Sequence, residues 1–212
     1  MQNSLEHLDA EELYHLALKA SEKGDHEGAI VMLKQSITQK PNANTQYILA
    51  AEHAEIGMYE RAAEEMVKAT ELDDTLWTAH FQLGLLYMML NKMDDAINTW
   101  DKLKQLDESD ALHLFGKGMT ALLQDQLEDA AKHIEHGIAL NLTNPALNAN
   151  MESVLSNLYA NMNLANADEK EKEEETASKQ TKAEDAEKRK ANPIFLASYD
   201  ERKDSERWIW VC

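Results

Sequence analysis

Residues 13–41 read LYHLALKASEKGDHEGAIVMLKQSITQKP, and three later segments repeat the pattern of this stretch. They are LAAEHAEIGMYERAAEEMVKATEL from Leu49, LGLLYMMLNKMDDAINTWDKLKQL from Leu83 and GMTALLQDQLEDAAKHIEHGIAL from Gly118. The four segments come into register on Ala29, Ala62, Ala96 and Ala130, which are 33, 34 and 34 residues apart. A fixed period of this length indicates a repeat architecture in which each repeat is one small structural unit.

Residues at fixed distances from these alanines predict a pair of helices in each repeat. Small residues stand twelve positions before them, where they allow two helices to approach closely: Ala17, Ala50, Gly84 and Gly118. Five positions before them are residues that tolerate the left-handed conformation at a helix end: Gly24, Gly57, Asn91 and Asp125. Apolar residues recur at helical spacing between these breaks. The pattern predicts helices over 10–22 and 26–38, 44–56 and 59–71, 77–90 and 93–105, and 111–123 and 127–139.

This pattern resembles the tetratricopeptide repeat (TPR) family over about residues 10–143. Pro41 stands where the family commonly places its closing proline, whereas the other repeats have Asp74, Glu108 and Leu142 there. The resemblance implies an all-α fold, a TPR-like right-handed superhelix of antiparallel helix hairpins. Its four repeats would span about 10–42, 43–76, 77–110 and 111–143.

Residues 144–162 are expected to form a capping helix, because the last repeat must not leave an apolar face open. Asn144 can cap this helix and Pro145 suits its first turn. Its apolar stripe would be Leu147, Met151, Val154, Leu155, Leu158 and Met162, with Asn148, Glu152, Ser156 and Asn157 facing water. Residues 163–193 are rich in charge and fit either a solvated helix or a disordered linker. We favour a helix that continues from the cap and stops by Pro193.

Residues 194–212 hold two apolar clusters, one around Phe195 and Tyr199 and one around Trp208 and Trp210. Two interpretations remain open for this C-terminal peptide. It could fold back onto its own repeats, or it could dock on another molecule.

The charge balance limits the classes of partner. The chain has 39 acidic and 21 basic residues and a formal net charge of −18. General nucleic-acid binding is not expected, because a phosphate backbone must be met by clustered lysine and arginine. Residues 1–162 hold 26 of the acids and 11 of the bases, so the repeats carry most of the excess. With no leader or membrane-spanning pattern and one cysteine, Cys212, a cytoplasmic protein is expected.

No catalytic or cofactor motif is recognisable in the sequence. It contains neither a phosphate-binding glycine loop nor a nucleophile elbow, so an enzyme is not expected and no cofactor is predicted. His133 and His136 lie one helical turn apart near Asp129, but without a second ligand pair we predict no metal site. Proteins similar to this family that bind acidic chaperone C-termini carry lysine and asparagine along the groove. The groove positions here hold no lysine or arginine, so such a carboxylate clamp is not expected.

The candidate site is a ladder of residues at equivalent places on the first helix of each repeat. The resemblance implies that these positions point into the concave groove, although the aromatic side chains could instead pack between repeats. The predicted groove residues are Tyr14, Tyr47, Phe81 and Phe115, then Leu18, Ala51, Leu85 and Met119, then Met88 and Leu122.

We favour the groove interpretation, in which a non-enzymatic adaptor or chaperone-like module binds an apolar and basic peptide or amphipathic helix of another protein. The alternative is a self-assembling or autoinhibited scaffold whose C-terminal peptide, with Phe195, Tyr199, Trp208 and Trp210, docks in a groove.

Overall fold

The structure is a computed structural model that describes residues 7–180, with side-chain surroundings described for 7–163. Every regular element in this part of the chain is helical. The chain divides into two units, whose described parts cover residues 7–155 and 156–180. None of the helices in the described part is long and apolar enough to cross a membrane.

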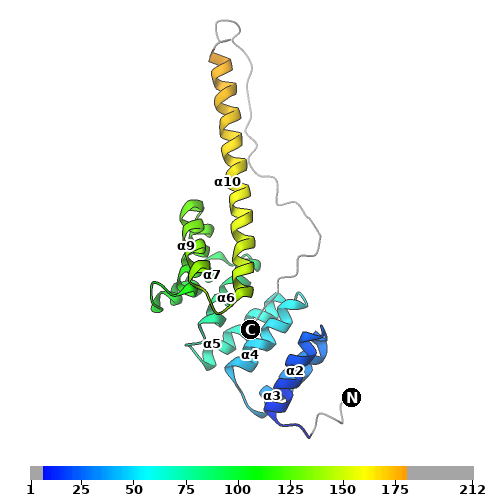
Figure 1. Ribbon diagram of the computed structural model, residues 1–212. Helices are drawn as coiled ribbons and strands as arrows, with labels where there is room; N and C mark the ends of the chain where they lie inside the picture. The colour runs from blue at the N-terminus through cyan, green and yellow to red at the C-terminus, as the bar shows by residue number, and fades with distance from the viewer. Residues whose placement is uncertain (1–6, 181–212) are drawn as a thin grey trace. The chain divides into compact units, whose positions relative to one another are not determined.

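The repeats form four helix hairpins, as the sequence pattern predicts (Figure 1). Their helices are α2 (Ala10–Glu22) and α3 (His26–Gln39), α4 (Ala43–Glu55) and α5 (Tyr59–Leu72), α6 (Trp77–Met89) and α7 (Met93–Asp101), and α8 (Ala111–Leu123) and α9 (Leu127–Leu140). The predicted bounds agree with these to within one residue, except at the end of α7. There the chain tightens into a 3₁₀ turn, η1 (Lys102–Gln105), because the last turn of a helix can close with i→i+3 hydrogen bonds.

The turn inside each hairpin requires a left-handed residue at the predicted position. Gly24 and Gly57 have φ of 76° and 75°, and Asn91 and Asp125 have φ of 58° and 59°. In the first hairpin the N–H of Asp25 then donates to the carbonyl of Ala20 over 2.9 Å. This bond satisfies a carbonyl that the end of the helix would otherwise leave without a partner.

Small residues bring the two helices of a hairpin together. A Cβ on Gly84 would lie 2.1 Å from Nε1 of Trp100, and a Cβ on Gly118 would lie 2.6 Å from Cγ1 of Ile134. Each glycine therefore leaves the space that a bulky residue of the second helix fills. The four alanines that set the register are fully buried: Ala29, Ala62, Ala96 and Ala130.

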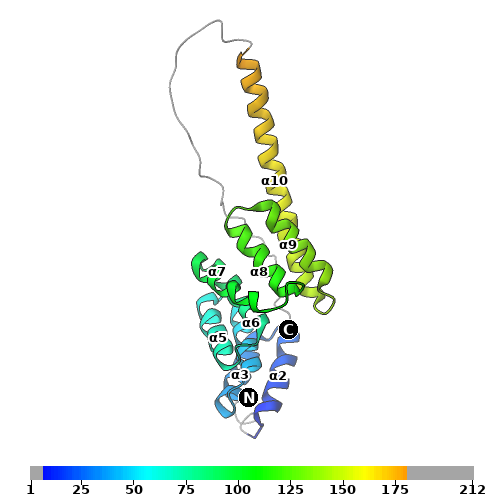
Figure 2. The same ribbon diagram turned by 90° about the vertical axis from the view of Figure 1, so that its left-hand side faces the viewer.

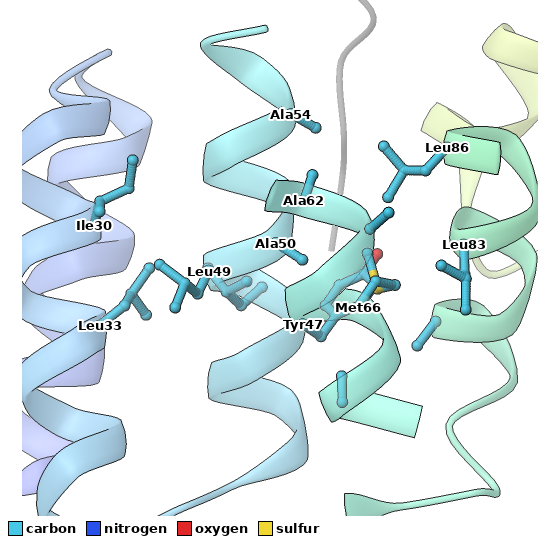
Figure 3. Close-up of a cluster of buried hydrophobic side chains, with 14 of the residues drawn as sticks. Ile30, Leu33, Tyr47, Leu49, Ala50, Ala54, Ala62, Met66, Leu83 and Leu86 are labelled. Carbon is cyan, nitrogen blue, oxygen red and sulfur yellow. The ribbon is translucent and has the colours of Figure 1, made fainter. Parts of the chain in front are cut away.

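The core runs continuously from one hairpin to the next (Figure 3). In the first three repeats, side chains of α3, α4, α5 and α6 form one cluster in which Leu33, Met66 and Leu86 are completely buried. Each hairpin thus covers its neighbour's apolar surface, which is why a single repeat would not hold its fold alone.

The helix after the repeats, α10 (Pro145–Gln180), begins as predicted. Its first turn is capped by Asn144, whose Oδ1 accepts a hydrogen bond from the N–H of Leu147. Leu147, Met151 and Leu155, which belong to the predicted apolar stripe, are buried. Helical structure continues through the charged segment to Gln180. The remainder of the predicted 163–193 segment lies outside the described residues.

One capping residue differs from the prediction. Asn148 was expected to face water, but it is half-buried and bonded to the end of α9. Its Nδ2 donates to the carbonyl of Asn141 over 3.0 Å, and its Oδ1 accepts from Nδ2 of Asn141 over 2.8 Å. The carbonyls at the end of α9 need donors, and an asparagine amide supplies them.

Candidate functional site

The candidate site is the surface formed by the first helices of the repeats, α2, α4, α6 and α8. At three of these helices, a polar side chain just before the first turn caps the helix and fixes where it begins. Asp9 forms a capping box with Glu12 at α2, Asn42 caps α4 and Asp110 caps α8. Because the helices begin at equivalent places in the 34-residue period, equivalent residues recur along the array.

The prediction that aromatic side chains line a groove is wrong for the second, third and fourth repeats. Phe81 and Phe115 are fully buried, and Tyr47 is 6% exposed. The ring of Phe81 lies 6.4 Å from that of Trp100 and 6.1 Å from that of Phe115, between centroids. These aromatic side chains therefore pack between helices and between repeats, which is the second of the two interpretations left open by the sequence.

Two backbone features explain why the rings turn inward. Trp100 donates its indole N–H to the carbonyl of Phe81 over 3.0 Å, which holds the two residues together. A Cβ on Gly137 would lie 2.6 Å from the ring of Phe115, so the glycine leaves room for that ring. Ala51 and Met119, one turn further along their helices, are also buried and offer no groove surface.

Five of the predicted groove residues keep part of their surface exposed: Tyr14, Leu18, Leu85, Met88 and Leu122. Leu18 and Leu85 occupy equivalent places in repeats one and three, and Met88 and Leu122 do so one turn later in repeats three and four. We call these four aliphatic and thioether side chains the apolar row. Each residue of the row is half-buried, whereas the equivalent places in repeat two hold the buried residues Ala51 and Ala54.

Tyr14 lines an open cavity of about 370 Å³ between the first two repeats. Most of the cavity wall is polar and comes from the starts of α2 and α4 and from the end of α3, including His15, Lys40, Asn42 and Asn44. This cavity could accept the polar backbone of a bound chain beside the tyrosine ring. Of the predicted groove residues, only Tyr14 lines this cavity.

A buried carboxylate joins the first two repeats, and the sequence analysis missed it. Glu52 is 3% exposed. It accepts a hydrogen bond from the hydroxyl of Ser21 over 2.5 Å and lies 2.8 Å from Nδ1 of His26. We call these three residues the Glu52 clamp. The available signal was a single acid within the small and apolar run LAAEHA, where a charged side chain needs partners to be buried.

Histidines are also buried without catalytic surroundings. His53 and His80 are 1% and 2% exposed, and Nδ1 of each has no hydrogen-bond partner. Removal from water lowers the pKa of both side chains, and the charge of Lys34 adds to the effect at His53. Both are therefore neutral core residues at pH 7.

The histidine pair on α9 does not gather further ligands. His136 is exposed and His133 is half-buried. In the described part of the chain, no three histidine, cysteine, aspartate or glutamate side chains are placed to hold a metal ion. The predicted docking residues Phe195, Tyr199, Trp208 and Trp210 lie outside the described residues.

Similarity to solved structures, and not to known sequences, identifies the fold of this chain. No protein-family model matches the sequence, and no curated protein matches it. Solved structures do match. A MamA from Desulfovibrio magneticus RS-1 is 17% identical, with a TM-score of 0.56, over 73% of this chain and 85% of that one.

Two further solved structures are similar to this chain. YrrB, described as a TPR protein with an unusual peptide-binding site, is 18% identical with a TM-score of 0.52, over 63% of this chain and 70% of its own. The Cut9–Hcn1 assembly of the APC/C contains a chain with a TM-score of 0.65 and 18% identity, of which this chain covers only 31%. The repeats of this chain therefore have the TPR fold.

Proposed function

We propose that this chain is a non-enzymatic protein-interaction module that binds an extended or helical segment of another protein along the first helices of its repeats. The observation that carries the proposal is the apolar row of Leu18, Leu85, Met88 and Leu122, whose side chains stay half-exposed on the first helices. Apolar side chains in line along a repeat array suit a ligand that presents its own apolar residues at regular intervals.

Charge indicates the character of the bound segment. Residues 1–162 hold 26 acids against 11 bases, so the surface around the row attracts basic ligands and repels acidic ones. A segment with apolar anchors and basic flanks would fit both properties. The peptide-binding site named for YrrB, a protein of the same fold, is in keeping with this mode of action.

The proposal is tested by selecting peptides from a random displayed library on the full chain. The double variant Leu85→Ser, Met88→Ser removes two half-exposed members of the row from one helix, α6. Val31→Ser is the matched control, because Val31 is 54% exposed on the second helix of repeat one. We expect selected peptides to be apolar and basic, to lose at least about tenfold in affinity for the double variant, and to keep their affinity for the control.

Two results would contradict the proposal. One is a selection that yields no enriched sequence. The other is a set of peptides that bind the double variant as tightly as the unchanged chain. Thermal unfolding followed by circular dichroism must show that the double variant remains folded under the binding conditions.

A further inference from the structure

A second cavity, of about 200 Å³, opens between the third and fourth repeats. Its wall is formed by residues of α7 and η1, of α8, and of the start and middle of α9. The ribbon of α8 contacts both α7 and α9 (Figure 2). None of the predicted groove residues lines it. The cavity is thus separate from the apolar row and from the proposed peptide site.

Gly116 lines the cavity where α8 packs closely against η1. A Cβ on Gly116 would lie 2.9 Å from Cδ1 of Leu103 and 3.5 Å from the carbonyl oxygen of Trp100. A Cβ at this place on α8 would therefore overlap the side chain of Leu103 in η1.

The lining is basic, although the protein is strongly acidic. Lys104, His113, Lys117 and His133 all contribute to the wall. The one carboxylate among the lining residues, Asp101, forms an ion pair with Lys104. Asp129 lies near His133 but pairs with Lys132, over 3.3 Å. Lys117 and the imidazoles of His113 and His133 also line the cavity, and the carboxylates of Asp107 and Asp129 act electrostatically on His113 and His133 from outside the lining.

One nitrogen of the His113 imidazole is already bonded to the backbone. Nδ1 of His113 lies 3.2 Å from the carbonyl oxygen of Leu106. Since a carbonyl only accepts, Nδ1 carries the proton in this bond and Nε2 is left for another partner. Burial lowers the pKa of His133, and the positive charges of Lys117, His113 and His136 lower it further against the opposing effect of Asp129. The uncharged form of the His133 imidazole is thus favoured when no anion is present.

We propose that this cavity binds a phosphate group. A tetrahedral dianion would pair with the ammonium group of Lys117, would favour protonation of the His133 imidazole and would accept hydrogen bonds from several directions at once. The hydroxyl of Thr120 and the amide of Gln124 provide further donors in the same wall. A carboxylate carries a single charge in one plane and would use fewer of these donors.

Inorganic phosphate is the first probe, titrated into the full chain at pH 7 with sodium chloride adjusted to keep the ionic strength constant. The readout is the NMR signal of the His133 imidazole, assigned with the variant His133→Gln. We expect a saturating shift of this signal toward the protonated form, because a bound anion favours the charged imidazole. Lys117→Ala should weaken phosphate binding about tenfold, through loss of one charge-assisted hydrogen bond.

Lys19→Ala is the matched control, because it removes an exposed lysine of α2 that does not line the cavity. It should leave the affinity within about twofold. The proposal is overturned if acetate or additional chloride produces the same response as phosphate, or if Lys117→Ala binds phosphate as tightly as the unchanged chain. Lys117 is exposed, so this variant should fold normally, and its thermal unfolding verifies that.

A final arm distinguishes the sources of the phosphate group. A short peptide containing phosphoserine is compared with inorganic phosphate and with the same peptide carrying serine. Binding of the phosphopeptide at least as tight as that of inorganic phosphate identifies a phosphorylated protein as the source. Binding of inorganic phosphate with exclusion of the phosphopeptide identifies a small phosphate compound. Failure of all three to bind would overturn the proposal.

Discussion

Single residues set how closely the helices of this protein approach. Gly84 illustrates the effect, since the indole of Trp100 occupies the volume that a side chain at residue 84 would need. The indole also needs the carbonyl of Phe81 as its hydrogen-bond acceptor, so neither partner can move away freely. One glycine and one tryptophan thereby fix the packing inside the third hairpin.

Gly84→Ala is expected to lower the free energy of unfolding by about 1–3 kcal/mol, because the added methyl group overlaps the indole of Trp100. Urea unfolding followed by circular dichroism measures the change. In a Trp100→Leu background, the same substitution should cost distinctly less, since the overlapping atoms are gone. An equal cost in both backgrounds would show that the indole is not what excludes a side chain at residue 84.

The buried histidines predict a dependence of stability on pH. His53 and His80 have pKa values below the usual 6.5 in the folded protein, chiefly because burial disfavours the charged ring. The unfolded chain then binds protons more readily than the folded one. Their contribution to stability is fully present above about pH 6.5 and is lost as the pH falls through the folded pKa.

We therefore expect the urea concentration at the unfolding midpoint to decrease when the pH is lowered from 7.5 to 5.5. Carboxylates also titrate toward acid pH, so the double variant His53→Gln, His80→Gln serves as the control. The drop in midpoint should be smaller in this variant, because glutamine does not gain a proton. An identical drop in both proteins would assign the acid sensitivity to other groups.

At the scale of the helices, the Glu52 clamp joins the first hairpin to the second. The carboxylate stands on α4, while Ser21 is at the end of α2 and His26 is at the start of α3. A single buried acid thus ties together three helices. Its removal would leave the Ser21 hydroxyl and the His26 ring without this acceptor.

Glu52→Ala should lower stability by about 1–3 kcal/mol, and the loss should appear first in the first repeat. Amide hydrogen exchange would then accelerate in α2 and α3 more than in α8 and α9. The control is Glu64→Ala, which removes an exposed acid of α5 and should change neither the free energy of unfolding nor the exchange rates. Uniform acceleration over the whole array would contradict a local role for the clamp.

At the scale of the whole array, the ring contact between Phe81 and Phe115 connects the third repeat to the fourth. Each ring is fully buried, so either substitution by alanine should cost about 3–5 kcal/mol. Because the rings contact each other, the cost of the double variant should differ from the sum of the single costs.

A double-mutant cycle in urea, read by circular dichroism, measures this coupling between repeats. Two variants that remain as stable as the unchanged chain but lose peptide binding would show that the rings form a ligand surface after all. Such a result would support the prediction that Phe81 and Phe115 line the groove.

The amino-acid sequence by itself determined the repeat period, the four hairpins, the helix bounds and the left-handed turns at Gly24, Gly57, Asn91 and Asp125. These features depend on contacts within a few turns of chain, and local residue preferences record such contacts directly. The sequence could also place Tyr14, Leu18, Leu85, Met88 and Leu122 on the first helices.

Only the tertiary structure decided which of these positions are open. The ring of Phe81 packs beside that of Trp100, whose indole also bonds to the Phe81 backbone, and Gly137 leaves space for the ring of Phe115. The Glu52 clamp and the basic cavity at Lys117 likewise join residues that are distant in sequence. Periodicity tells which face of a helix a residue occupies, whereas burial of that face depends on the sizes of side chains that arrive from neighbouring helices.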